Sequence, residues 1–263
     1  AGGEAYGYRL RLGPPQPDFR LWMEPASLNI PSDGSALVTV HVRRLHGFDG
    51  EIRVALEYPP LSIACEGGVV PPGVERVVMT VSTEGVRYPR TVFGLALTGL
   101  AQVDGREVRR PVVPVSYGAA PDGLLAVREI RELAAKVGYG ARALRADPLA
   151  KGEAPPDPRI PMPVAFKAPV PVGRDVPVRL NLLSATLAPQ LGGLYVPMVV
   201  WPERGFTAQG VQPTNRQERA GVLLQADART FKAGQTAFVI LGCYLRGDTN
   251  RVPLAVTQSV PVV

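Results

Sequence analysis

The chain has 263 residues and a net charge of +6 at pH 7. An ordinary β-sandwich domain has about 100 residues, so this length favours two domains and a connector. Hydrophobic residues make up 46% of the chain, which excludes disorder as the main state, and its 28 glycines and 28 prolines predict an all-β fold with many turns.

The first 17 residues predict the end of a domain that precedes this chain. In residues 6–12, Tyr and Leu alternate with Gly and Arg, which is typical of a strand, and residues 13–17 form a Pro-rich linker. The stretch YGYRLRLGPPQPDF resembles the junction that follows bacterial pre-peptidase C-terminal domains. An unpaired strand would expose apolar side chains and backbone groups. We therefore expect residues 6–12 to be covered by an upstream domain, by the first sandwich, or by self-assembly with another copy of the chain.

Residues 18–50 predict the opening of a β-sandwich. Two runs place an apolar residue at every second position, which puts those side chains on one face of a pleated strand. A turn sequence follows each run, PSDG at 31–34 and HGFDG at 46–50. The predicted inward residues are Phe19, Leu21, Met23, Val38, Val40 and Val42, and the predicted outward residues are Arg20, Glu24, Thr39, His41 and Arg43.

Residues 18–117 contain seven strand candidates at the spacing of an immunoglobulin-like sandwich. The candidates are 19–24 with 27–30, 36–43, 51–58, 61–65, 74–82, 91–100 and 107–116. The segments DFRLWMEPASLNIPSDGSALVTVHV, HGFDGEIRVAL, PPGVERVVMTVS and TVFGLALTG resemble, in this order, the Ig-like and fibronectin-like modules of secreted bacterial peptidases and glycosidases, especially those in large planctomycete surface proteins. The resemblance covers about 100 residues. It implies an accessory module of an exported protein.

Residues 118–159 interrupt the strand pattern and predict a linker with one helix at about 122–137. Asp122 is a suitable helix N-cap, and Gly138 can end the helix. Glu132 and Lys136 have the i,i+4 spacing of helical ion pairs. The apolar residues at helical spacing are Leu124, Val127, Ile130, Leu133, Ala134 and Val137.

Residues 160–263 return to the pattern of the first sandwich, which predicts a diverged internal duplication. Val40 and Leu180 occupy the same place in the two alternations, and so do Phe93 and Phe238. The strand candidates are 163–168, 175–183, 194–201, 205–211, 220–227, 236–245 and 251–262. The predicted fold is therefore all-β, with two tandem immunoglobulin-like β-sandwiches joined by a helix-containing linker.

The charge distribution argues against nucleic-acid binding. Basic residues are scattered singly along the strands, apart from the pairs Arg43-Arg44 and Arg109-Arg110, and no basic stripe alternates with stacking aromatics. No apolar run approaches the roughly 20 residues that span a bilayer, so we expect no membrane insertion. The resemblance instead implies other domains of the same polypeptide, or a protein or glycan at the cell surface, as partners.

The sequence contains no catalytic motif, and we predict that the chain is not an enzyme. A nucleophilic side chain needs an oriented base. The only histidines are His41, on a predicted outward strand face, and His46, at a predicted hairpin tip. No Gly-x-Ser-x-Gly elbow is present. Cys65 and Cys243 fall in different predicted domains, which favours two free thiols over a disulfide, and with two histidines they do not supply a zinc site.

We expect no cofactor, with calcium as the alternative. Four aspartates in predicted turns could gather at one end of a sandwich: Asp33, Asp49, Asp104 and Asp248. The chain has no Asp-x-Asp-x-Asp-Gly loop, and each of these aspartates is explained by its turn.

Two tryptophans are the candidates for a ligand-binding or junction surface. Trp22 lies between the outward residues of its strand, and Trp201 lies at a strand end before Pro202. An exposed tryptophan can stack on a sugar ring, but it also commonly covers a domain junction. The sequence therefore predicts a non-catalytic spacer, scaffold or adhesion module of an exported bacterial protein, located outside the cell or on its surface. The alternative is a carbohydrate-binding or protease-accessory module that uses exposed aromatics.

Overall fold

The structure is a computed structural model. It describes residues 13–32, 34–58, 62–83, 92–119, 125–129, 133–138, 144–148, 175–182, 195–211, 221–232, 234–247, 249 and 252–262. The regular secondary structure in these ranges consists of β-strands, so the protein is all-β, as the sequence predicts.

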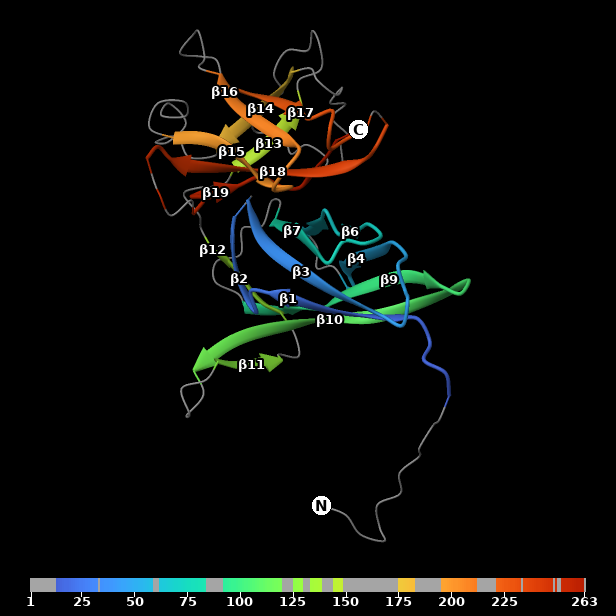
Figure 1. The fold of residues 1–263 in the computed structure, drawn as a ribbon. Helices are drawn as coiled ribbons and strands as arrows, with labels where there is room; N and C mark the ends of the chain where they lie inside the picture. Colours follow the sequence, from blue (N-terminus) through green and yellow to red (C-terminus); the bar gives the residue numbers. More distant parts are fainter. Residues whose placement is uncertain are drawn as a thin grey trace.

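Nine strands of the N-terminal half form the largest sheet. They are β1 Asp18–Glu24, β3 Ser35–Leu45, β4 Ile52–Leu56, β5 Ile63–Glu66, β6 Val69–Val70, β7 Arg76–Thr83, β9 Leu97–Val103, β10 Arg106–Ala119 and β11 Leu125–Glu129. Their order is β5-β7-β3-β1-β10-β9-β4-β6, and β11 pairs with β10 beside that path (Figure 1). Since β1 pairs antiparallel with β3 and parallel with β10, it lies in the middle of the sheet.

The alternation predicted for β1 and β3 is confirmed. All six predicted inward residues are at most 4% exposed and belong to one hydrophobic core. The positions between them face outward, where Arg20 and Arg43 are exposed and Trp22 and His41 are half-buried.

A smaller sheet covers the other side of this core. Its strands are β2 Ser27–Pro31, β8 Val92–Leu95 and β12 Leu133–Gly138, in the order β2-β12-β8. Leu28, Leu95 and Leu133 of the three strands lie in the same core cluster as Phe19 and Val40 of the largest sheet. The two sheets therefore enclose one core in a sandwich-like arrangement.

At two short interruptions between strands, the chain passes from one sheet to the other. β1 ends before Pro25, which has no N–H to donate to the ladder, and β2 begins in the smaller sheet two residues later. The chain returns to the largest sheet at Ala96, between β8 and β9. The predicted single strand 91–100 is thus two strands in different sheets.

The helix predicted at about 122–137 is wrong for the part of this range that the structure describes. Residues 125–129 form β11, and residues 133–138 form β12. β12 pairs in parallel with β2 and antiparallel with β8, and Leu133 is fully buried in the core. Backbone pairing with strands far away in the sequence, together with this burial, outweighs the local helical spacing.

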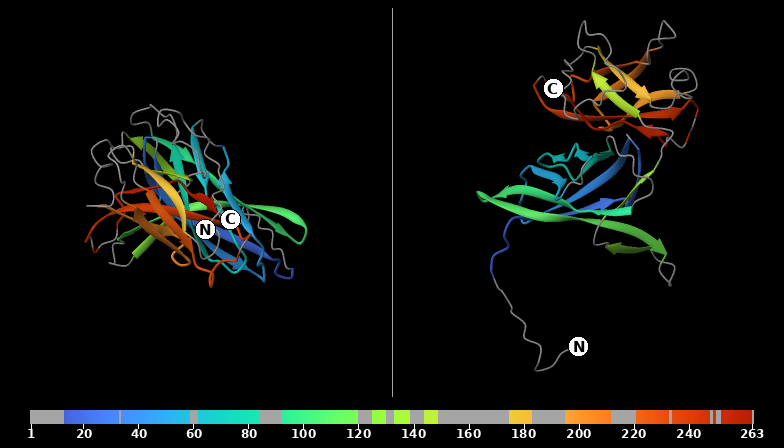
Figure 2. Two further views of the ribbon diagram at one scale, coloured as in Figure 1. Left: turned by 90° about the horizontal axis from the view of Figure 1, so that it is seen from above. Right: turned by 180° about the vertical axis from the view of Figure 1, so that it is seen from behind.

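The remaining strands form two smaller sheets of the C-terminal half. One has the order β13-β14-β17-β16, and in the other β18 pairs with β15, β19 and β20. Their bounds are β13 Leu144–Pro148, β14 Asp175–Leu182, β15 Tyr195–Trp201, β16 Phe206–Val211, β17 Gly221–Ala226, β18 Ala237–Leu245, β19 Ala255–Val256 and β20 Val260–Val262. A second hydrophobic core joins the two sheets, with Phe206 and Leu224 from one and Val239, Leu241 and Val260 from the other. Figure 2 shows these strands on one side of the N-terminal sheets.

The two cores meet at a buried junction. The backbone N–H of Ser259 donates to Thr80 Oγ1 over 2.8 Å, and both residues are at most 1% exposed. Trp201, at the end of β15, packs against the first core. At the rim, Arg76 forms an ion pair with Glu203. The junction thus joins β7 to the C-terminal strands through polar and apolar contacts.

Several predictions lie wholly or partly outside the described residues. The strands at 6–12 and 163–168 are outside them, as are the side chains of Phe93 and Leu180, on which the register of the proposed duplication depends. The domain limits 1–17, 18–117, 118–159 and 160–263 stay predictions. The described residues contain no helix long and apolar enough to cross a membrane.

Candidate functional site

A groove of about 540 Å³ opens on the outer face of the largest sheet. It is formed by β1, β3 and β10, which are neighbours in that sheet. Its polar and aromatic lining includes Arg20, Trp22, Arg43, Arg110 and Tyr117. Its apolar lining includes Pro111, Val113 and Val115. The groove therefore combines aromatic rings, cations and an apolar floor.

Trp22 is held in the groove by the alternation of β1. Its neighbours Leu21 and Met23 are buried in the core, so Trp22 faces outward. The indole stacks on His41 of β3, with ring centroids 5.3 Å apart and 6° between the ring planes. Because Trp22 and His41 are cross-strand partners, the register of β1 and β3 fixes this stack.

Glu24 of β1 contacts side chains of both neighbouring strands, β10 and β3. Its carboxylate oxygen Oε1 accepts a hydrogen bond from the hydroxyl of Tyr117 on β10 and lies 3.7 Å from Nε2 of His41. The hydrogen bond to Glu24 raises the pKa of Tyr117, because the carboxylate favours the neutral phenol. Tyr117 thus stays a hydrogen-bond donor at neutral pH.

Two arginines stand directly opposite each other beside this aromatic cluster. Arg20 of β1 and Arg43 of β3 are cross-strand partners, and both are exposed. Like charges in directly opposed positions repel. Within the described residues, neither guanidinium forms a direct ion pair, and the charge of Arg20 makes a small contribution to the lowered pKa of Asp18. This pair leaves two guanidinium groups available at the groove.

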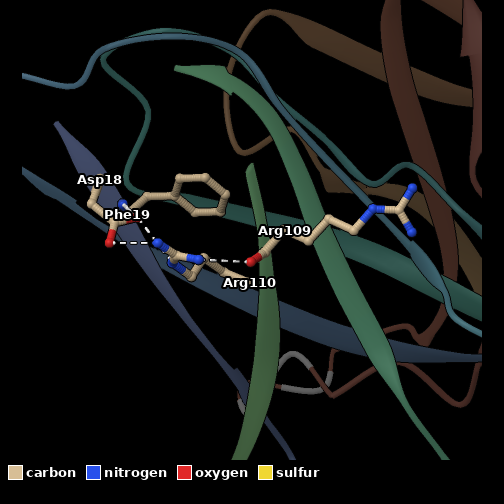
Figure 3. Close-up of polar contacts among 4 residues, drawn as sticks. All are labelled: Asp18, Phe19, Arg109 and Arg110. Carbon is tan, nitrogen blue, oxygen red and sulfur yellow. Dashed lines mark hydrogen bonds and ion pairs between the residues drawn. The ribbon is translucent and has the colours of Figure 1, made fainter. Parts of the chain in front are cut away.

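A third arginine of the groove is already paired. Arg110 donates to both carboxylate oxygens of Asp18, from Nε over 3.0 Å and from a terminal nitrogen over 2.9 Å, as Figure 3 shows. The side chain of Arg109 extends away from this contact. Burial would raise the pKa of Asp18, but the hydrogen bonds from Arg110 and from the backbone N–H of Phe19 lower it on balance.

The lowered pKa of Asp18 predicts an acid-sensitive contribution to stability. The contribution is present above the pKa in the unfolded chain, about 3.9, and is lost as the pH falls through the lower pKa of the folded state. We expect Asp18→Asn to reduce the free energy of unfolding by about 1 kcal/mol at neutral pH, and by much less at about pH 2. Urea unfolding at the two pH values measures this.

Glu107→Gln is the matched control for Asp18→Asn. Glu107 also pairs with an arginine, Arg109, but the side chains of both partners are more than half exposed. Its loss should change the free energy of unfolding by less than about 0.5 kcal/mol. Equal effects of the two variants would show that partial burial of the Asp18–Arg110 pair does not increase its contribution to the free energy of unfolding.

The other residues singled out by the sequence lie away from the groove. Trp201 packs against the first core at the junction, so the structure brings the two tryptophans to different places. His46 is exposed in the turn after β3, with φ of 52°. Cys65 and Cys243 are free thiols, as predicted. Burial raises their pKa to about 12 and about 11, respectively, which makes them poor nucleophiles.

Two of the four loop aspartates lie in the part of the chain that the structure describes. Oδ1 of Asp49 accepts a hydrogen bond from the backbone N–H of Gly73, and Asp104 occupies the turn between β9 and β10. Asp33 and Asp248 lie outside the described residues. Among the residues described, no three His, Cys, Asp or Glu side chains could hold one metal ion.

Comparisons with known proteins add no function. No protein-family model and no curated protein matches the chain. A similar solved structure is the crystal structure of a protein of unknown function from Porphyromonas gingivalis W83. The two are 11% identical with a TM-score of 0.23, and the match covers 92% of this chain and 98% of that one.

Proposed function

We propose that this chain is a non-catalytic structural and interaction module of a larger exported bacterial protein, with a spacer, scaffold or adhesion role. The observation that carries the proposal is the buried junction between the two cores, where Ser259 donates to Thr80. A spacer must keep its parts in a fixed orientation. A hydrogen bond that is excluded from water resists separation of the cores, because breaking it leaves buried groups unsatisfied. The resemblance of residues 18–117 to Ig-like accessory modules supports the same role.

Small-angle X-ray scattering tests the scaffold role. The proposal predicts a scattering curve of the purified chain that one fixed arrangement of the two cores explains at every protein concentration. A curve that requires two flexibly linked cores would contradict it.

Export and the absence of catalysis need separate tests. The reading frame upstream of Ala1 should begin with a signal peptide, and a leaderless cytoplasmic frame would contradict export. The purified chain should leave a panel of peptides and glycans intact. Hydrolysis that one point substitution abolishes would show that the chain is an enzyme.

A second candidate function is carbohydrate binding, as an accessory to a peptidase or glycosidase domain. The groove favours it, since Trp22 is stacked in place on His41 beside Tyr117 and an apolar floor. Sugar rings present apolar faces that stack on such indoles and hydroxyls that bind polar groups at the rim.

We expect Trp22→Ala to reduce glycan affinity by about tenfold or more, because the stacking surface is lost. Tyr58→Ala is the control, since Tyr58 is an 82% exposed aromatic outside the groove and its loss should leave affinity unchanged. A glycan array followed by calorimetry on the best ligand measures both. An array without signal for the native chain would leave only the spacer or scaffold role.

A further inference from the structure

We propose that the groove binds an acidic polysaccharide built from uronic acids, whose carboxylates are held by Arg20 and Arg43. This inference rests on the carbohydrate-binding candidate and names the chemical class of its ligand.

The arginine pair places two positive charges side by side at the groove. Arg20 and Arg43 face each other across β1 and β3 on the outward face of the sheet. An opposed pair of like charges costs stability unless an anion lies between them. Two other exposed strand arginines do have a carboxylate partner, since Arg53 pairs with Glu51 and Arg109 with Glu107.

Two acidic groups beside the groove, in the part of the chain that the structure describes, already have hydrogen-bond partners. Asp18 accepts three hydrogen bonds, two from Arg110 and one from the backbone N–H of Phe19. Glu24 accepts from Tyr117 and lies beside His41. None of these described carboxylates forms a direct ion pair with Arg20 or Arg43, so the carboxylate of a ligand can neutralise the pair. Arginine suits this role because its planar fork binds a carboxylate through two parallel hydrogen bonds.

The position of Trp22 favours a sugar acid over an acidic peptide. Trp22 and Arg20 are two residues apart on the same face of β1, which separates them by about 7 Å. A sugar ring stacked on the indole would thus present its own or a neighbouring carboxylate to the arginine pair. The stack on His41 and the strand register hold both parts of the site before the ligand arrives.

Calorimetric titration of the purified chain with an oligogalacturonide tests the proposal. The native chain should bind this acidic ligand more tightly than a neutral oligosaccharide of the same length. Arg20→Gln/Arg43→Gln should weaken oligogalacturonide binding by about tenfold or more, because two charge-assisted contacts are lost. Arg53→Gln/Arg109→Gln removes the same charge outside the groove and should change affinity by less than about twofold. Thermal unfolding confirms that both double variants are folded.

Different negative results would contradict the uronic-acid ligand alone or carbohydrate binding as a whole. Equal, Trp22-dependent binding of neutral and acidic oligosaccharides would overturn the uronate inference and leave carbohydrate binding intact. Binding of neither would overturn both. Equal binding of polyglutamate would identify an acidic peptide as the ligand class. Equal weakening by both double variants, or tighter binding of dextran sulfate that survives Trp22→Ala, would indicate general charge attraction and contradict a built site.

Discussion

Replacing Gly68 with alanine is expected to reduce the free energy of unfolding by about 3 kcal/mol. Gly68 lies between β5 and β6, and its carbonyl accepts a hydrogen bond from the N–H of Val54 over 2.7 Å. A Cβ at this position would lie 2.1 Å from the Val54 carbonyl oxygen. The carbonyl belongs to the backbone, and the position of a Cβ is fixed by its own backbone, so neither group can turn away as the end of a flexible side chain could. The strands must separate, which also weakens the hydrogen bond.

Gly13→Ala is the control for Gly68→Ala. Gly13 is exposed, and a Cβ there would have no neighbour within 4 Å. Urea unfolding of the two variants should show a near-native midpoint for Gly13→Ala and a large decrease for Gly68→Ala. A change below about 0.5 kcal/mol for Gly68→Ala would mean that β4 and residue 68 are not held at this distance.

Replacing Thr80 with valine should reduce the free energy of unfolding by about 2 kcal/mol. Valine has nearly the shape of threonine, but it cannot accept the hydrogen bond from the backbone N–H of Ser259. That N–H would stay buried without a partner, which costs more than the hydrogen bond contributes. Because this hydrogen bond joins the two cores, we also expect them to unfold less cooperatively in the variant.

Ser259→Ala provides a matched control at the same contact. The Ser259 hydroxyl has no hydrogen-bond partner among the described atoms, and it lies close to Gly67. Its removal should change stability by less than about 0.5 kcal/mol, while the backbone N–H keeps its bond to Thr80. Differential scanning calorimetry of the two variants measures both effects. If Ser259→Ala reduced the free energy of unfolding as much as Thr80→Val, the stability of the junction would depend on packing volume and not on this hydrogen bond.

The sequence predicts individual strands well because most of them bury one face. Alternation is a local pattern, and the burial of Phe19, Leu21 and Met23 follows from it directly. The assignment of strands to sheets is not local. β8 and β9 read as one strand, yet the chain changes sheets at Ala96, and only their partners β12 and β4 reveal it.

The prediction of a helix was wrong for the same physical reason. The apolar residues of 122–137 have helical spacing, but β12 finds ladder partners in β2 and β8. Those partners lie far away along the chain, so no local pattern shows them. Where a segment can complete a sheet and bury Leu133 in the core, tertiary pairing decides its conformation.

Part of the candidate site was visible in the sequence. Alternation placed Trp22, Arg20 and Arg43 on the outward face, and the structure gathers all three at the groove. The sequence could not show that Arg20 and Arg43 are direct partners, because that depends on the register of β1 and β3. Tyr117 was missed because it lies 93 residues from Glu24 along the chain. Only the parallel pairing of β10 with β1 brings the two residues together, and no local pattern shows that pairing.

Tryptophan fluorescence tests the central claim, that the Trp22 groove is a binding face, most directly. The chain has two tryptophans, so Trp201→Phe leaves Trp22 as the only reporter and Trp22→Phe leaves Trp201 at the junction. On titration with oligogalacturonide, the emission of the Trp201→Phe chain should shift to a saturating value, while that of the Trp22→Phe chain should stay constant. No change in the first chain, or a saturating change in the second alone, would contradict the claim.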